Sequence, residues 1–169
     1  MSAPLFLFVL VLLQSLDLTG TWKLDPAQSR ITTSAGYPGL IASGAPVTLH
    51  ITHASNGTVV IESQINESHS RIYKPGLKTS TPVGPSATVT ATSRWDGRAL
   101  ISEGSVDPVS GSSIAVREVV SLSADGKTLT VDLTTTGSSG TNNSVLVYTK
   151  STGVEPCKSW PTPCKTFGF

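Results

Sequence analysis

Two glutamates in the second half of the chain are the residues whose type and spacing could do acid–base chemistry. Glu118 alternates in phase with Val120, and Glu103 follows Ile101 at the same two-residue spacing. Alternate side chains of a strand share a face, so each carboxylate is expected on an apolar face, where it is costly unless paired or hydrated. The two could form an acid–base pair or contact the polar head of a ligand. The alternative is that the carboxylates have neither role and either contact interior water or lie at the end of a strand.

Arginine and aromatic side chains supply the other candidate ligand contacts. A guanidinium beside such a carboxylate, from Arg71, Arg94 or Arg117, could hold the polar head of an amphipathic ligand. We expect Arg71 to neutralise a carboxylate head, and Tyr37 to act from the long connection at 26–45. The residues predicted to line the ligand site are Tyr37, Arg71, Tyr73, Trp95 and Glu118.

Recognised catalytic motifs are absent from the sequence. It contains no G-x-S-x-G elbow, H-E-x-x-H zinc motif or phosphate-binding loop, and its many serines stand in no distinctive context, so they are assigned to the surface. His50 and His53 are three apart, which places them on opposite strand faces, and with His69 they are expected in surface or capping roles. We predict no catalytic residue, metal or cofactor. A barrel isomerase or cyclase that uses Glu103 and Glu118 is the alternative.

Charge and composition narrow the class of partner. Charged residues make up 14% of the 169-residue chain, the formal net charge is +1, and no block of like charge occurs. An average globular protein has about 25% charged residues. This composition argues against nucleic-acid binding, which needs a basic surface, and against a polybasic contact with anionic lipid. A small hydrophobic or amphipathic molecule is the expected partner, and a monomer the expected state.

The N-terminus carries an unbroken apolar run, LFLFVLVLL, at residues 5–13. It is too short to cross a bilayer but has the length of a signal-peptide core. We predict a signal peptide at 1–16, no membrane span after its removal, and a secreted or periplasmic location. A buried first strand is the alternative.

Both cysteines lie in the C-terminal tail at 151–169, in the stretch EPCKSWPTPCK. Cys157 and Cys164 are close enough in sequence to bridge, and the prolines between them favour a tight loop. In an oxidising compartment a disulfide is the expected state of such a pair. The bridge would secure the tail rather than the preceding domain.

Nearly every segment from 17 to 150 shows the alternation of a β-strand. Turn signals separate the segments, and Asn56-Gly57 and Asp96-Gly97 are strong hairpin pairs. The best helix candidate is a single turn at 25–28. Because a long antiparallel meander exposes two edges, closure is the economical solution. We predict an all-β domain, an antiparallel up-and-down β-barrel of about 8–10 strands, with a β-sandwich as the alternative.

The stretch LTGTWKLD opens the first predicted strand with Gly20 and Trp22. The glycine would let another segment approach closely, and the tryptophan would close one end of the barrel. This G-x-W pattern resembles the opening of lipocalins and related calycins, and TGTWKL is similar to the first strand of intracellular fatty-acid-binding proteins. Lipocalins often have an arginine near the last strand that packs over this tryptophan, whereas the nearest cation at that end of this chain is Lys150. The lipocalin T-D-Y motif is also missing.

Further short motifs extend the resemblance over residues 18–150. They are TWKLDPAQS at 21–29, WDG at 95–97 and SADGKTLTV at 123–131. Their order and spacing resemble those of small exported bacterial lipocalin-like domains. The resemblance implies a lipocalin-like barrel that binds or carries a small apolar or amphipathic molecule without catalysis. The alternative is a structural or interaction domain of the cell envelope with a filled barrel, whose outer face or tail contacts a partner.

Overall fold

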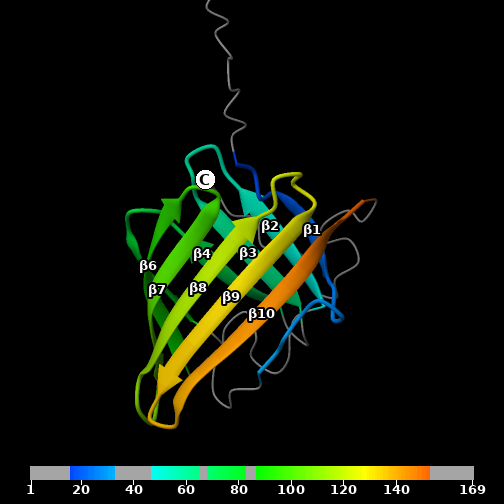
Figure 1. Cartoon of the computed structure of the whole chain (residues 1–169). Coiled ribbons are helices and arrows are strands. Elements are labelled where there is room, and N and C mark those ends of the chain that lie inside the picture. Colours follow the sequence, from blue (N-terminus) through cyan, green and yellow to red (C-terminus); the bar gives the residue numbers. More distant parts are fainter. Residues whose placement is uncertain (1–15, 33–46, 65–67, 83–86, 153–169) are drawn as a thin grey trace, which may run out of the picture.

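The computed structural model describes residues 16–32, 47–64, 68–82 and 87–152 and shows ten β-strands (Figure 1). Within these ranges there is no α-helix, and hence no helix suited by length and hydropathy to crossing a membrane. The strands are β1 (Gly20–Leu24), β2 (Thr48–His53), β3 (Val59–Gln64), β4 (Ser68–Tyr73), β5 (Lys78–Pro82), β6 (Ala87–Asp96), β7 (Ala99–Pro108), β8 (Ile114–Leu122), β9 (Thr128–Gly137) and β10 (Gly140–Ser151).

All ten strands belong to one sheet with the order β4-β3-β2-β1-β10-β9-β8-β7-β6-β5. The first and last strands pair with each other, with Trp22 of β1 opposite Lys150 of β10. Strands β4 and β5 form the two ends of the sheet. Figure 1 shows the sheet curled on itself, with β2 to β4 passing behind β7 to β10. The predicted up-and-down barrel is therefore confirmed, in nearly closed form, and the sandwich is excluded.

The hairpin turns are built on glycine, as predicted, but two differ in detail. Strand β6 ends at Asp96 and β7 begins at Ala99, so the two-residue loop is Gly97 and Arg98 rather than Asp96 and Gly97. Gly97 has a φ of 55°. This left-handed conformation favours glycine and matches the twist of the flanking strands.

The turn after β2 is longer than a two-residue hairpin loop. The amide of Gly57 donates to the carbonyl of Ala54 (2.9 Å), and the side chain of Asn56 accepts from the amide of Thr58 (2.9 Å). Gly57 has a φ of 83°. Asparagine thus acts through its side chain, a common way in which this residue stabilises turns.

Residues 25–28 form a turn rather than a helix. One carboxylate oxygen of Asp25 accepts hydrogen bonds from the amides of Ala27 (3.0 Å) and Gln28 (3.2 Å). The hydroxyl of Ser29 donates to the Asp25 carbonyl (2.7 Å) and accepts from the amide of Val147 (2.9 Å). The side chain of Asp25 thus stabilises the turn, and the bonds of Ser29 return the chain to the edge of β10 after β1.

Buried apolar side chains form two separate clusters inside the barrel. The first cluster occupies the half with the β6–β7 and β8–β9 turns, and it comprises Leu18, Trp22, Leu49, Ile51, Val59, Ile61, Tyr73, Leu100, Val120, Leu122, Leu129, Val131, Leu146 and Tyr148. The second cluster occupies the other half and comprises Ala87, Val89, Ala91, Val106, Val116 and Leu133. Each fully buried Leu- or Val-sized side chain contributes about 1.5–3 kcal/mol, so the larger cluster dominates the stability of the barrel.

Gly20 and Trp22 have the structural roles expected of them. The Trp22 ring is fully buried, and its Nε1 donates to the carbonyl of Leu18 (3.0 Å). The Nζ of Lys150 lies 5.4 Å from the centre of the Trp22 ring, so a lysine holds the position over the tryptophan where lipocalins often have arginine. A Cβ at Gly20 would lie 2.9 Å from the Lys150 Cε, so glycine permits this close approach.

Several predictions concern segments outside the described residues. These are the signal peptide, nearly all of which lies in 1–15, the segment around Tyr37, and the tail with Cys157 and Cys164. They stay predictions.

Candidate functional site

Three polar side chains form a row across the inner face of the barrel. In the register of the sheet, Ser93 of β6 lies opposite Ser102 of β7, which lies opposite Glu118 of β8. Each of the three is only 1% exposed. They sit between the two apolar clusters, because Ala91 precedes Ser93 on the same face and belongs to the second cluster, whereas Trp95 follows it and packs on the first. The interior thus has a polar layer between two apolar halves.

Arg71 crosses the interior to meet Glu118. The guanidinium Nη1 donates to Oε1 at 3.1 Å, and Nη2 lies 3.0 Å from Oε2. The hydroxyl of Tyr73 donates to Oε2 at 3.0 Å, and the Arg71 guanidinium lies 5.1 Å from the centre of the Tyr73 ring. Arg71 and Tyr73 belong to β4, which is six places from β8 in the sheet order, so only curvature of the sheet brings them together. Three of the predicted ligand-site residues therefore meet in one cluster, which we call the Arg71–Tyr73–Glu118 cluster.

This ion pair is almost completely removed from solvent. The side chains of Arg71 and Glu118 are 6% and 1% exposed. Burial likewise raises the pKa of the core residue Tyr148. A two-pronged contact between guanidinium and carboxylate is the strongest neutralising geometry that side chains offer. The charge of Arg71 is thus already met by a residue of the protein itself.

The two serines of the row have no hydrogen-bond partner among the described residues. Both Ser93 Oγ and Ser102 Oγ are fully buried. A buried hydroxyl without a partner costs about 1–3 kcal/mol, which makes two neighbouring examples unusual. The prediction that serines belong to the surface is wrong at these positions. The one signal in the sequence was their phase, because Ser93 alternates with Val89 and Ala91.

Glu103 lies on the outside of the barrel, contrary to the prediction that it shares a face with Glu118. Its side chain is 46% exposed and contacts Arg94 (2.7 Å) and Arg117 (3.0 Å). Hydrogen bonds from these two arginines lower the pKa of the Glu103 carboxyl. The two glutamates therefore have no common site, and the proposed acid–base pair is wrong. The reason is that Leu100 and Ile101 are both apolar, and it is the Leu100 phase that faces inward on β7.

Trp95 lies near one end of the barrel rather than in the polar row. It is half-buried against the first cluster, and its ring stacks on that of His53 with 5.4 Å between the ring centres. His50 lies on the opposite face of β2, as the three-residue spacing predicted. Burial lowers the pKa of His50, with a smaller opposing effect from a backbone hydrogen bond at Gly20.

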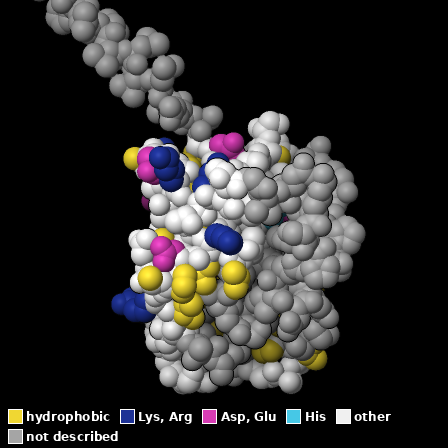
Figure 2. Space-filling model, turned by 90° about the vertical axis from the view of Figure 1, so that its right-hand side faces the viewer, with side chains coloured by type: hydrophobic (Ala, Val, Ile, Leu, Met, Phe, Trp, Pro, Cys, Tyr) yellow, Lys and Arg dark blue, Asp and Glu magenta, His cyan; other side chains and the backbone are white. Residues whose placement is uncertain are grey.

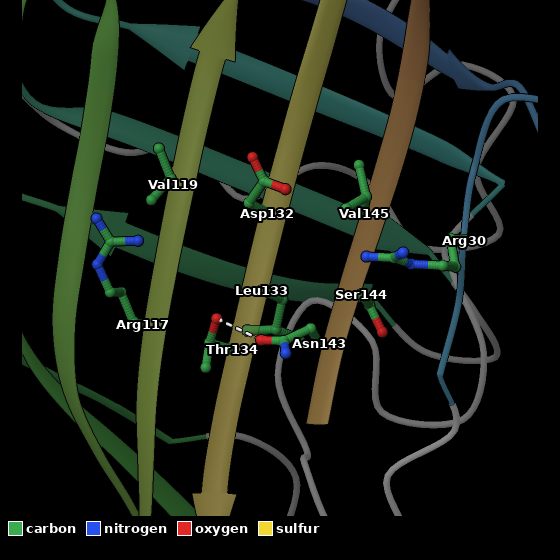
Figure 3. Close-up of a pocket in the computed structure, with 9 residues that line it drawn as sticks. All are labelled: Arg30, Arg117, Val119, Asp132, Leu133, Thr134, Asn143, Ser144 and Val145. Atoms are coloured by element: carbon green, nitrogen blue, oxygen red, sulfur yellow. Dashed lines mark hydrogen bonds between the residues drawn. The ribbon is translucent and has the colours of Figure 1, made fainter. Parts of the chain in front are cut away.

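A groove of about 430 Å³ runs along the outside of the barrel over β8, β9 and β10 (Figure 3). Figure 3 shows Arg117 at one side and Arg30 at the other, with Asp132 between them. The lining residues are Arg30, Arg117, Val119, Asp132, Leu133, Thr134, Asn143, Ser144 and Val145. Arg117 and Asp132 come from the outward phases of β8 and β9, so this groove is separate from the polar row inside. On the side of the molecule shown in Figure 2, basic and acidic side chains are interspersed and do not form a block of one sign.

No protein-family model matches the chain, and no curated protein matches it significantly. Solved structures do match it. A REP1-NXSQ fatty acid transporter has a TM-score of 0.58 at 12% identity, over 81% of this chain and 98% of that chain. Apo lipid binding protein 8 of Caenorhabditis elegans has a TM-score of 0.56 at 13% identity, over 79% and 95%.

A third similar structure is zebrafish ileal bile acid-binding protein complexed with cholic acid, with a TM-score of 0.51 at 14% identity over 79% of this chain and 98% of that chain. At such identities a structural likeness speaks to the fold, not to the ligand. Together with the ten-stranded, nearly closed antiparallel meander, it shows that the chain has the up-and-down β-barrel fold of these structures.

Proposed function

We propose that the protein binds a small apolar or amphipathic molecule inside its barrel and does not act on it chemically. The observation that carries this proposal is the row of buried polar side chains in an otherwise apolar interior. Ser93 and Ser102 offer hydroxyls that have no partner among the described residues, next to the paired Glu118. Ligand sites typically combine an apolar lining with a few polar groups of this kind. The printed names of the similar structures, which concern fatty acids, lipids and a bile acid, point in the same direction.

The size of the barrel and its lining support room for such a ligand. About eight strands give an interior that side chains just fill or that holds one small ligand, and the diameter grows with strand number. This barrel has ten strands. The second cluster is lined mainly by small side chains, with Ala87, Val89 and Ala91 on β6. We place the apolar part of the ligand against this cluster and its polar part at the serines.

The apolar tail alone gives only weak binding. A twelve-carbon chain would contribute about 9 kcal/mol if fully buried, at about 0.8 kcal/mol for each methylene. Association itself costs about 4–15 kcal/mol, so at most about 5 kcal/mol remains, which corresponds to a Kd of about 0.2 mM, and binding in the micromolar range also requires hydrogen bonds at the polar row. Shorter molecules would depend more strongly on hydrogen bonds at Ser93 and Ser102.

The Arg71–Tyr73–Glu118 cluster supports binding without catalysis. A general base needs a lone pair within reach of the substrate proton. The oxygens of Glu118 already accept from two guanidinium nitrogens of Arg71 and from the hydroxyl of Tyr73. We therefore assign the cluster a role in holding β4 across the barrel and in shaping the interior.

We also propose that the protein works outside the cytoplasm. The apolar run at 5–13 and the paired cysteines in the tail support export into an oxidising compartment. Intact mass spectrometry of protein expressed with its own N-terminus gives the test. Loss of about the first 16 residues, and a two-hydrogen mass difference on reduction of Cys157 and Cys164, are the expected results. An uncleaved chain with two free thiols would contradict the proposal.

Titration with Nile red, a neutral dye whose fluorescence rises in apolar surroundings, tests the binding function. We expect saturable binding to the folded protein that Ala91→Trp abolishes, because the indole would occupy space at the second cluster. Ala115→Trp is the matched control, since Ala115 is exposed on β8. If Ala91→Trp fails to give a cooperative thermal transition, Ala91→Leu replaces it. Absence of saturable binding to the folded wild-type protein would refute the proposal.

A further inference from the structure

We infer that the interior site takes an amphiphile whose polar head is uncharged, such as an alcohol, ester or amide, in preference to one with an ionised carboxylate. This inference rests on the proposed function and names its ligand class. It departs from the expectation that Arg71 neutralises the head of a carboxylic acid. Three features of the polar row carry it: the balance of charge, the hydrogen-bonding capacity of the serines, and the position of the row between the clusters.

Among the residues that the structure describes, the one positive and the one negative charge at the polar row balance each other. Among the described residues Arg71 is the one buried lysine or arginine, and Glu118 meets its charge at 3.0 and 3.1 Å. Glu62 is the other buried carboxylate among the described residues. Because its neighbour Ile61 points into the first cluster, Glu62 lies on the outward face of β3. A ligand carboxylate would bring a second negative charge next to Glu118, whose side chain is 1% exposed, and at such a buried site like charges strongly disfavour ionisation. A cationic head would be repelled by Arg71 for the same reason. A neutral head avoids the repulsion from both charged residues.

The two serines match a neutral head. A serine hydroxyl donates one hydrogen bond and accepts others, so it can pair with an alcohol, a carbonyl or an amide. Ser93 Oγ and Ser102 Oγ are buried, lack partners among the described residues and lie opposite each other in the register. A bound hydroxyl or carbonyl would remove the cost of burying them unpaired. They are the recognition groups that the Arg71–Glu118 pair leaves available.

The position of the row fixes how such a ligand would lie. The row stands at the boundary between the two clusters, and Ala91 and Val116 immediately precede Ser93 and Glu118 on the inward faces of their strands. A polar head at the serines would therefore direct an alkyl chain along the small side chains of the second cluster. Because the head and the tail occupy separate places, ligands with the same tail and different heads can be compared to measure which head the site prefers.

Displacement of Nile red by 1-dodecanol and by dodecanoate at about pH 8, where a carboxylic acid is ionised, tests the inference. We expect dodecanol to displace the dye from wild-type protein at a concentration at least about tenfold lower, the ratio that corresponds to one hydrogen bond or one unfavourable charge contact. Equal or tighter binding of dodecanoate would overturn the inference while leaving the proposed function intact. Failure of Nile red and both displacers to bind would instead refute the proposed function.

Variants at the charged pair sharpen the test. Glu118→Gln keeps the shape of the side chain but removes the negative charge that Arg71 meets, so dodecanoate should gain about tenfold relative to dodecanol. Glu103→Gln, which removes an equal charge from the outer face, should leave the ratio unchanged. A ratio that is the same in Glu118→Gln as in wild-type protein would count against the inference.

The serines provide a second route if Glu118→Gln does not fold. In the double variant Ser93→Ala and Ser102→Ala, dodecanol should lose about tenfold in affinity, whereas dodecane, which has no polar head, should bind as before. An unchanged preference for dodecanol over dodecane in the double variant would overturn the inference.

Discussion

Removal of one partner of the buried Arg71–Glu118 pair should destabilise the barrel more than removal of both. Glu118→Ala leaves the guanidinium of Arg71 buried without its carboxylate, and Arg71→Ala leaves the carboxylate without its guanidinium. The double variant Arg71→Met with Glu118→Leu replaces the pair by apolar side chains of similar length. The two β-strands that carry the pair are far apart in the sheet order, so the pair also ties opposite walls of the barrel together.

The magnitude follows from the burial of the pair. Because the side chains are 6% and 1% exposed, solvent screening gives little relief to a lone charge. Breaking a buried pair by losing one partner costs about 3–5 kcal/mol, whereas an apolar replacement of both partners is about neutral for the charges. It also removes the acceptor of the Tyr73 hydroxyl, which costs about 1–3 kcal/mol. Domains of this kind are stable by about 5–15 kcal/mol, so each single variant should lose a large part of its stability. At about 2–4 °C per kcal/mol, the melting temperature should fall by about 6–20 °C.

Urea unfolding followed by tryptophan fluorescence suits the measurement, because the Trp22 ring is fully buried in the folded barrel. The matched control is the exposed pair of Arg94 and Glu103, whose removal should cost no more than about 1 kcal/mol. The reasoning fails if each single variant at the buried pair loses less than about 1 kcal/mol, or if the losses of the singles simply add in the double variant.

Two further predictions concern the first strands. Gly20→Ala should lower the free energy of unfolding by about 1–3 kcal/mol, because φ is 146° at this residue and a Cβ would crowd the Lys150 side chain. An unchanged urea midpoint would contradict it, and Gly137→Ala is the control, because a Cβ there would lie at an ordinary contact distance of 3.7 Å from the Ile114 side chain. The free energy of unfolding should also fall as the pH drops below 6.5, the ordinary pKa of histidine, because burial lowers the pKa of His50 and the unfolded chain takes up the proton first. That loss is complete only below the lowered pKa of the folded state. Urea midpoints measured across this range should show a smaller loss in His50→Gln, and an equal loss would assign the pH dependence to other groups.

Local sequence patterns determined the ladder of hairpins and the closure of the barrel. Alternation of apolar side chains has a period of two, and glycine at turns such as Gly97 fixes where each strand ends, so both signals are contained in short segments. The pairing of β1 with β10 was predictable because a meander of this length gains by covering its edges. Phase alone also placed Glu118 on an inward face. Apart from the long-range pairing of β1 with β10, these features need no knowledge of distant contacts.

Tertiary structure decided which charges meet. Arg71 and Glu118 are 47 residues apart, and nothing in either segment says that curvature of the sheet brings β4 opposite β8. It also decided which face of β7 is inside, since Leu100 and Ile101 are both apolar and either phase satisfies the alternation. That choice sent Glu103 outward and brought Ser102 into line with Ser93 and Glu118. A strand pattern defines two faces, but only the closed sheet makes one of them an interior.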